Sequence, residues 1–430
     1  MTTCLLSPVP TGERRRFSTC SCFPMPFLSQ PLRRVCLLLL PLLLLPAQGH
    51  GQTDLAKLIS HGGYAVTANG AILRSHNMAV AFVPASTIKL VTCLAALKTL
   101  GADYRFKTAF FLDRNHNLFI KGSGDPYLTS DAVSQIAEEL ARQGLKQIRD
   151  IALDGSAFSV KDPADGTENS ANPYDAANGA LAVNFNSIPI TVLADHTVIS
   201  GEQQTPLLPI MQEIGSRLAP GTYRLNSESF PSRNPLPATL RYTGELFRAM
   251  LARQGIKVSG KIIAARTADG MQPFFTYTSE KPVEDLVRSC LQYSNNFLAN
   301  QLFLVCGAER HGWPATWQKG RKAMQAFINT TWPKDKQAII MIEGSGLSRK
   351  DQISPAAMLA VLETFKPYAD LLKSKDGIPL KSGTMADVYC YAGYFPHGND
   401  TDPFVIMLNQ RENSRDELLA LLRQVRAERH

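Results

Sequence analysis

Hydrophobic positions recur with strand periodicity in some segments and with helix periodicity in others, which predicts a mixed α/β protein. Near the start of this pattern, residues 64–67 and 71–74 flank Ala68-Asn69-Gly70, a sequence typical of a β-hairpin turn. Residues 86–100 are apolar on nearly all sides and are followed by a glycine, so they predict a buried central helix. Ser86 therefore falls at the first turn of a buried helix, where backbone N–H groups lack intrahelical partners.

The pattern changes between residues 106 and 269. Short alternating segments predict strands at residues 107–112, 118–121, 148–153 and 181–192. Six prolines between residues 201 and 240 predict that this stretch is mostly connecting chain. We interpret the middle block as a strand-rich accessory domain inserted into another domain.

The C-terminal part returns to longer helices and strands. Helices are predicted at residues 284–290, 295–306 and 355–366, and strands at residues 337–342, 378–383, 388–395 and 403–408. A last helix follows Ser414-x-x-Glu417, which has the form of a capping box. The two early strands and the three last strands can form one antiparallel sheet closed from both ends of the chain. The helix of Ser86 would then lie between that sheet and the other helices.

Length and composition set the domain plan. A chain of 430 residues with 44% hydrophobic and 19% charged residues is globular and long enough for two or three domains. We expect a leader at 1–49, a main domain built from 50–105 and 270–430, and the insert at 106–269. About half of the net charge of +8 falls in the leader, and no Lys/Arg stripe is interleaved with aromatic residues, so nucleic acid is not an expected partner.

The N-terminal segment has the features of an export signal. Arg33-Arg34 precede an apolar run at residues 35–45, and Ala47-Gln48-Gly49 supplies small residues suited to cleavage. The run is too short for a stable membrane span, and Pro41 interrupts it. We predict export followed by release as a soluble protein, and the sequence leaves an oligomer open.

Cysteine spacing gives no sign of a metal site. Beyond the leader the chain has Cys93, Cys290, Cys306 and Cys390, each in an apolar stretch and none in a Cys-x-x-Cys pair. We favour buried free thiols for these four, with one or two disulfides as the alternative. No metal and no cofactor is expected.

The chemistry is predicted by three short motifs in a fixed order. The first is Ser86-x-x-Lys89, whose two side chains lie one above the other on a helix. A lysine can take the proton of a serine hydroxyl if burial or a neighbouring cation lowers its pKa, and the helix start places positive partial charge where an oxyanion would form. The alternative is a non-catalytic role, in which the serine caps the helix and the lysine reaches solvent.

The second motif is Ser294-Asn295-Asn296, at the start of a predicted helix. Ser294 could pass a proton toward a leaving amine, and Asn296 could hydrogen-bond a substrate amide; the alternative is a simple N-cap pair. Ser-x-Asn also occurs at Ser170-Ala-Asn172 and Ser232-Arg-Asn234, where polar or proline-rich surroundings indicate loop caps.

The third motif is Lys381-Ser382-Gly383-Thr384 on a predicted strand. Gly383 would let a substrate backbone approach closely, and Lys381 with the Ser382 or Thr384 hydroxyl suits a carboxylate. The backbone N–H of Thr384 could be a second oxyanion donor; a surface turn is the alternative. Together the three motifs predict serine acyl transfer, and neither a Gly-x-Ser-x-Gly elbow nor a His-Glu-x-x-His motif competes with them.

On these residues the sequence resembles the DacB-type D-alanyl-D-alanine carboxypeptidase/endopeptidases, the class C low-molecular-mass penicillin-binding proteins. The resemblance runs from about residue 64 to the C-terminus. Besides the three motifs it includes Gly122-Ser-Gly-Asp-Pro126, Asn184-Phe-Asn186, the extension of the second motif to Asn300, and Gly344-Ser-Gly-Leu-Ser-Arg349. It implies a serine β-lactamase/D,D-transpeptidase-like domain with an antiparallel sheet flanked by helices, plus the strand-rich insert.

The resemblance also implies roles and partners. Ser86 would be the acylated serine and Lys89 its base, while Ser294 and Lys381 would form a second proton-handling pair. The substrates would be peptidoglycan stem peptides and cross-links, β-lactam antibiotics would acylate the same serine, and the protein would be periplasmic. Asp175, Arg349 and Gln352 are candidates for contacting the third amino acid of the stem peptide. A β-lactamase and a non-catalytic envelope scaffold of the same fold are the alternative functions.

Overall fold

The computed structural model describes residues 55, 57–168, 170–230, 234–398 and 400–428. The predicted export signal lies outside the described residues. Among the helices in these ranges, none has the length and apolar character needed to cross a bilayer.

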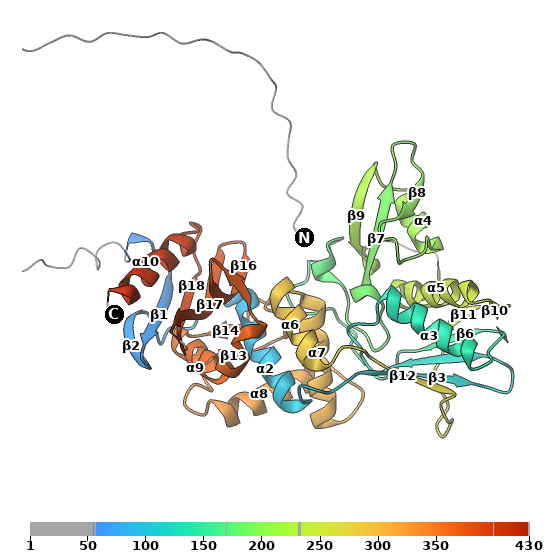
Figure 1. The fold of residues 1–430 in the computed structure, drawn as a ribbon, viewed down its shortest axis with the longest axis horizontal. Helices are drawn as coiled ribbons and strands as arrows, with labels where there is room; N and C mark the ends of the chain where they lie inside the picture. The colour runs from blue at the N-terminus through green and yellow to red at the C-terminus, as the bar shows by residue number, and fades with distance from the viewer. Residues whose placement is uncertain (1–54, 56, 169, 231–233, 399, 429–430) are drawn as a thin grey trace, which may run out of the picture. The chain divides into compact units, whose positions relative to one another are not determined.

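A six-stranded antiparallel sheet joins the two ends of the described chain, which confirms the sheet predicted from the sequence (Figure 1). Its order is β15-β16-β17-β18-β1-β2. The strands are β1 (Gly62–Ala68), β2 (Ala71–His76), β15 (Lys373–Lys375), β16 (Ile378–Met385), β17 (Val388–His397) and β18 (Asp400–Leu408). Strands β1 and β18 pair in register from Gly62 opposite Leu408 to Val66 opposite Phe404.

Both faces of this sheet are covered, because alternate residues of its strands point to opposite sides. Phe404 and Ile406 pack on one side under α10 (Arg415–Ala427), whereas Val405 and Met407 pack on the other side, in the main core. That core also contains α2 (Lys89–Thr99), α6 (Val283–Tyr293), α7 (Asn296–His311), α8 (Trp317–Thr331) and α9 (Pro355–Phe365). The predicted capping box does not form, since Ser414 Oγ donates to the Leu58 carbonyl instead.

The middle block, which we interpreted from the sequence as an insert and continue to call by that name, contains a five-stranded mixed sheet in the order β11-β6-β4-β3-β12. Its strands are β3 (Lys107–Leu112), β4 (Leu118–Gly122), β6 (Ile151–Asp154), β11 (Ile262–Ala264) and β12 (Phe275–Thr278). Helices α3 (Ser130–Arg142) and α5 (Ala238–Arg253) cover one face (Figure 1). Because β12 pairs with β3, this sheet extends past residue 269, where we had predicted that the insert ends.

Several predicted elements of the insert were wrong in extent. Residues 201–240 hold α4 (Pro209–Gly215), β9 (Gly221–Asn226) and the start of α5, which lie between segments of connecting chain. Proline fits the first turn of a helix, and Pro209 lies there in α4. The strand predicted at 181–192 is confined to β7 (Ser187–Val192), which forms a three-stranded sheet with β8 (Val198–Ser200) and β9. Short paired strands complete the fold: β5 (Gln147–Ile148) with β10 (Lys257–Val258), and β13 (Ile339–Ile340) with β14 (Gln352–Ile353).

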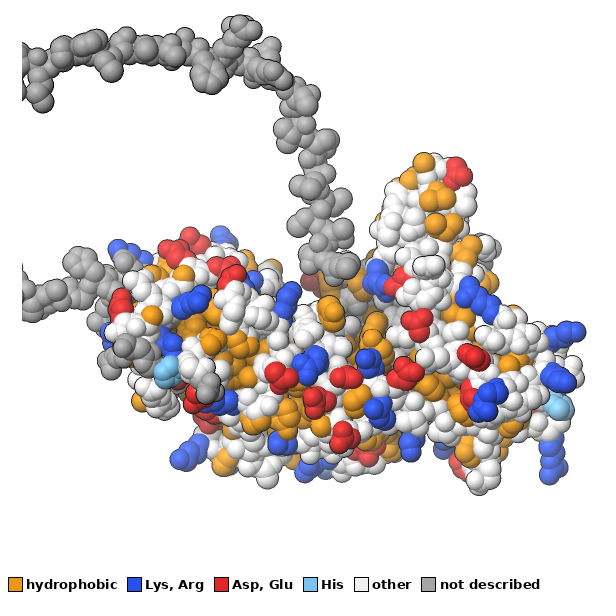
Figure 2. Space-filling view, viewed as in Figure 1, with side chains coloured by type: hydrophobic (Ala, Val, Ile, Leu, Met, Phe, Trp, Pro, Cys, Tyr) orange, Lys and Arg blue, Asp and Glu red, His pale blue; other side chains and the backbone are white. Residues whose placement is uncertain are grey.

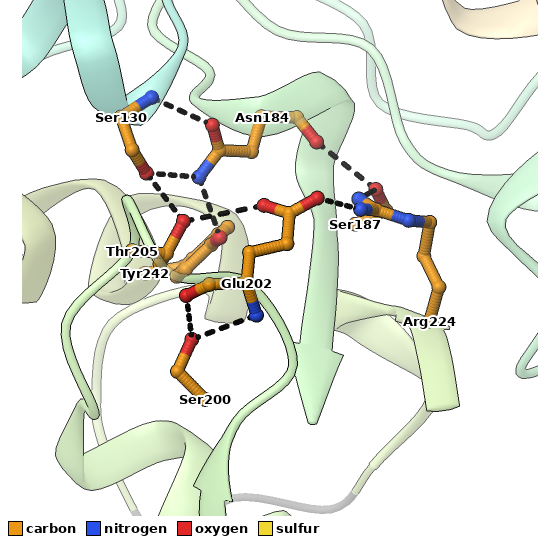
Figure 3. Close-up of polar contacts among 8 residues, drawn as sticks. All are labelled: Ser130, Asn184, Ser187, Ser200, Glu202, Thr205, Arg224 and Tyr242. Carbon is orange, nitrogen blue, oxygen red and sulfur yellow. Dashed lines mark hydrogen bonds and ion pairs between the residues drawn. The ribbon is translucent and has the colours of Figure 1, made fainter. Parts of the chain in front are cut away.

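Asn184 connects helices α3 and α5 of the insert through hydrogen bonds (Figure 3). Its Oδ1 accepts from the backbone N–H of Ser130 at 2.8 Å, at the start of α3, and its Nδ2 donates to Tyr242 Oη at 2.8 Å, on α5. Thr205 extends this buried network from Ser130 Oγ toward Glu202, which pairs with an arginine on β9. Buried polar groups that are fully hydrogen-bonded in this way hold the two helices in one arrangement.

The same turn connects the insert to the main core. Asn184, Phe185 and Asn186 all have positive φ, at 47°, 60° and 50°, a backbone shape uncommon outside glycine. Phe185 packs edge-on against Phe297 of α7, at a ring-centroid distance of 6.3 Å. The insert is thereby anchored to the helix that begins at Asn296.

The four cysteines beyond the leader are buried and free, as favoured from the sequence. On the face in view in Figure 2, lysines and arginines are interspersed with aspartates and glutamates.

Candidate active site

Ser86 lies in a tight turn that three backbone features define. The 3-10 helix η1 (Ala85–Ile88) precedes α2, and Ala85 has φ of +46°. Two glycines let other segments approach this turn: a Cβ on Gly346 would lie 2.0 Å from the Ala85 carbonyl oxygen, and one on Gly383 would lie 3.1 Å from the Ser86 nitrogen. Strand β16 is therefore packed directly against the nucleophile turn, and Ser86 itself is partly exposed.

Lys89 Nζ is fully buried and makes three hydrogen bonds. It lies 2.8 Å from Ser86 Oγ, 2.7 Å from Asn296 Oδ1 and 2.6 Å from the Ser345 carbonyl oxygen. The side-chain nitrogen of Asn296, Nδ2, donates to the Tyr174 carbonyl at 3.2 Å. Asn296 and Ser345, which come from distant segments of the chain, thus hold the amine of Lys89 beside Ser86.

Ser294 has a left-handed backbone, with φ of 53°, at the C-cap of α6. The neighbouring Asn295 caps α7, since its Oδ1 accepts from the Leu298 N–H at 2.9 Å. Ser294 therefore ends helix α6. The sequence had suggested instead that Ser294 begins the next helix. This position directs its hydroxyl to Lys381, whose Nζ lies 2.9 Å from Ser294 Oγ.

Both lysines have depressed pKa values. Burial lowers the pKa of Lys89. Burial, and then the nearby positive charge of Lys89, lower the pKa of Lys381 to about 7. Desolvation disfavours an ammonium, and two like charges in one site disfavour each other. A neutral amine beside a serine hydroxyl can act as a general base, and an amine with a pKa near neutrality can give or take a proton.

Glu343 is a buried residue that the sequence did not single out. Its carboxylate accepts hydrogen bonds from the N–H groups of Ser345, Gly346 and Leu347, at 2.7, 2.5 and 2.8 Å. These bonds close the turn that presents the Ser345 carbonyl to Lys89. Asp351 lies close by, and burial followed by the charge of Glu343 raises its pKa well above the usual range.

The third motif lies on strand β16, and its last residue, Thr384, lines the cleft beside Ser86. Lys381 is buried, Ser382 is partly exposed and Thr384 is exposed. Thr384 Oγ1 accepts from Arg415 at 2.7 Å, and the Gly383 carbonyl accepts from the same guanidinium at 3.0 Å. Arg415 begins α10 near the C-terminus, and the sequence offered no spacing signal to connect it with this strand.

A cleft of about 660 Å³ opens over these groups, and its lining includes Ser86, Ser294, Asn296 and Thr384. Arg349 also lines it, with Glu168 and Asp165 on the side of the insert. The other two candidates for contacting a stem peptide are not among its lining residues. Asp175 is buried and accepts from Ser170 Oγ at 2.7 Å and from the Glu168 N–H at 3.3 Å, while Gln352 pairs in strand β14. Asp175 acts on this cleft by shaping the loop of Glu168.

The three motifs, which are far apart in the sequence, are thus brought together at one cleft. Its polar groups are two amines, two serine hydroxyls, one amide and the backbone N–H groups of a helix start and a strand. Among the described residues, no group of three or more His, Cys, Asp or Glu side chains is placed to hold a metal ion. This set of groups suits nucleophilic attack by a serine, stabilisation of an oxyanion and proton transfer to a leaving group.

Sequence comparison matches the chain to the family described as "D-Ala-D-Ala carboxypeptidase 3 (S13) family" over residues 57–215 and 221–380. The chain is 27% identical over 348 residues to a D-alanyl-D-alanine carboxypeptidase DacB of Haemophilus influenzae, covering 72% of this chain and 71% of the relative. It is 25% identical over 381 residues to a D-alanyl-D-alanine carboxypeptidase of an Actinomadura species, covering 79% of this chain and 67% of the relative.

Solved structures share the fold. The crystal structure of penicillin binding protein 4 (dacB) from Haemophilus influenzae superposes with a TM-score of 0.71 at 22% identity, covering 87% of this chain and 98% of that one. A second structure of that protein, complexed with a β-lactam, gives a TM-score of 0.65 over the same shares of the two chains.

Proposed function

Because the chain belongs to the D-Ala-D-Ala carboxypeptidase 3 (S13) family, we propose that it is a serine-type D-Ala-D-Ala carboxypeptidase and endopeptidase acting on peptidoglycan. The observation that carries this proposal is the pair of short contacts at one cleft. Lys89 Nζ lies 2.8 Å from Ser86 Oγ, and Lys381 Nζ lies 2.9 Å from Ser294 Oγ.

The reaction follows from these contacts. Ser86 Oγ attacks the carbonyl of the D-Ala–D-Ala bond, or of a D-Ala–diamino-acid cross-link, while Lys89 takes the hydroxyl proton. The N–H groups of Ser86 and Thr384 stabilise the oxyanion at the helix start and on β16. Ser294, supplied by Lys381, protonates the leaving amine. Water then hydrolyses the acyl-enzyme and restores Ser86.

Other lining groups of the cleft suit the rest of a stem peptide. Ser382, Gly383 and Thr384 on β16 would bind the substrate backbone and its terminal carboxylate, with Asn296 near the amide. Arg349 and Glu168 both line the cleft, and these opposite charges suit a side chain bearing both an amine and a carboxylate. Asp165 also lines the cleft, but its carboxylate already pairs with Lys350 Nζ at 2.6 Å. A diamino-dicarboxylic residue at the third stem position has that chemistry.

The predicted leader and the location of the substrate support a periplasmic protein. A β-lactam imitates the D-Ala–D-Ala bond, so it would acylate Ser86 and leave slowly. The superposed fold with a bound β-lactam supports this expectation.

Labelling with a fluorescent penicillin tests the proposal. We expect stable labelling of the wild type, none of Ser86→Ala, and wild-type labelling of Ser134→Ala, a serine on α3 of the insert. Mass analysis of products from purified muropeptides then separates loss of a terminal D-Ala from cleavage of cross-links. Equal labelling of wild type and Ser86→Ala would end the proposal, and rapid penicillin turnover would favour a β-lactamase.

A further inference from the structure

A second pocket of about 630 Å³ lies on the face of the insert sheet that α3 and α5 leave uncovered. Ala109 pairs across β3 with Lys121 on one side and Thr276 on the other, so these three residues share a face. Alternation along β3 adds Lys107 and Phe111 to it. The opposite face bears Phe110 and Ile120 in the buried core.

The pocket combines cations with an exposed aromatic ring. Its lining contains Lys107, Lys121 and Arg266 and no carboxylate residue; the carboxylate of Asp269 approaches Arg266 at 3.9 Å, and both side chains are largely exposed. Trp313 also lines the pocket with 40% of its surface exposed, and its ring lies 6.4 Å from that of Phe158. A flat apolar ring in a pocket that also bears cations suits a ligand with apolar ring faces and carboxylate groups.

The pocket is also connected to the active site by one helix. Helix α7 begins at Asn296, which binds Lys89, and ends at His311, two residues before Trp313. Sixteen residues of α-helix span about 24 Å. A stem peptide of about five residues reaches at most about 18 Å when extended, so it cannot occupy the active site and this pocket at once. A longer polymer can reach both sites.

We propose that this pocket binds a stretch of peptidoglycan glycan strand, a chain of N-acetylated amino sugars whose carboxylates are free where no stem peptide is attached, while the active site cleaves a stem peptide carried elsewhere on the strand. Sugar rings lie on Trp313, and carboxylates pair with Lys107, Lys121 and Arg266. This inference rests on the proposed function and adds that the preferred substrate is the polymer and not a small fragment.

Co-sedimentation with purified, insoluble peptidoglycan sacculi tests the inference, with the active site first blocked by penicillin. We expect Lys107→Gln/Lys121→Gln and Trp313→Ala each to weaken binding about tenfold. The matched control is Lys146→Gln/Lys257→Gln, which removes two exposed cations at the β5–β10 pair and leaves the pocket intact. All variants should retain wild-type penicillin labelling of Ser86 and wild-type cleavage of soluble muropeptides.

Glycan strands stripped of stem peptides should compete for the pocket in the wild type and not in Trp313→Ala. Unchanged binding in the pocket variants, equal loss in the control pair, or binding of peptides alone would overturn the inference. If the wild type is not labelled by penicillin, the proposed function fails. Sedimentation of the wild type and of the pocket variants with sacculi is measured without reference to labelling, so the inference about the pocket is tested separately.

Discussion

Asn296 Oδ1 accepts a hydrogen bond from Lys89 Nζ at 2.7 Å, which joins the second motif to the base of the first. Burial lowers the pKa of Lys89, and an amide oxygen holds the amine in place without adding a negative charge that would raise this pKa. The identity of this side chain therefore matters for catalysis as much as its position does.

Replacing this amide by a carboxylate gives the first prediction. In Asn296→Asp the new charge favours the ammonium form and raises the pKa of Lys89. We expect penicillin acylation to fall about tenfold or more at pH 7 and to recover partly at higher pH, because Lys89 must be neutral to take the proton. The adjacent Asn295→Asp is the control, since aspartate also caps a helix. Identical pH profiles for both variants would contradict the prediction.

The pH dependence of the wild type should report Lys381. Its pKa is about 7 in the free protein, so the ammonium is present below that pH and is lost above it. If the ammonium supplies protons to Ser294, kcat/KM on a peptide substrate should decline as the pH rises through about 7, because kcat/KM reports groups of the free enzyme. Lys381→Gln should have low activity without this decline. A decline that persists in the variant would assign it to another group.

Gly346 has no space for a side chain against the nucleophile turn. Gly346→Ala should reduce acylation about 100-fold, because a Cβ there would lie 2.0 Å from the Ala85 carbonyl and must displace Ser86. Gly144→Ala is the matched control: its φ of +90° is similar to the +81° of Gly346, but nothing lies within 4 Å. The control should lose about 1 kcal/mol of stability and no activity. Urea unfolding with penicillin labelling measures both, and normal labelling of Gly346→Ala would refute the steric argument.

Asp125 should make stability depend on pH. Burial raises its pKa to about 6, partly offset by a hydrogen bond from the Tyr127 N–H. The folded state then holds a proton that the unfolded state releases at lower pH, so this contribution to stability is present below pH about 4 and is lost as the pH rises through about 6. The loss amounts to roughly 3 kcal/mol.

Asp125→Asn keeps an acceptor for Tyr127 and has no proton to lose. It should therefore be more stable than the wild type at pH 7.5 and close to it at pH 4. Asp269→Asn, at a side chain that is 96% exposed, should follow the wild type at both pH values. Thermal unfolding at the two pH values checks this, and a constant difference between wild type and Asp125→Asn would be inconsistent with it.

The sequence predicted those parts of the site that depend on local spacing. Ser86 and Lys89 are three residues apart, so helical geometry alone brings them together. The sheet closed from both ends was predictable from strand periodicity. Glu343 and Arg415 could not be found in this way, because their partners depend on how a turn and a terminal helix pack against distant strands.

Proline and serine patterns did not show two local features of the structure. The prolines between residues 201 and 240 indicated connecting chain, but one of them starts α4 and others precede α5. Ser414 matched a capping box, yet its hydroxyl donates to the Leu58 carbonyl, which tertiary packing brings within reach.

Asp175 was predicted to contact a substrate. In the structure it is buried and accepts a hydrogen bond from Ser170 Oγ, so it shapes a loop beside the cleft.

The pairing of β1 with β18 has a consequence for the order in which the protein matures. The central ladder of the main sheet joins a segment that is synthesised early to one that is synthesised nearly last, so the residues around Ser86 cannot acquire their support until almost the entire chain has emerged. Closing so large a loop is slow. The intervening segment contains its own apolar core and can fold earlier, so reactivity at the serine would arise only as the final step, after a scaffold is already in place.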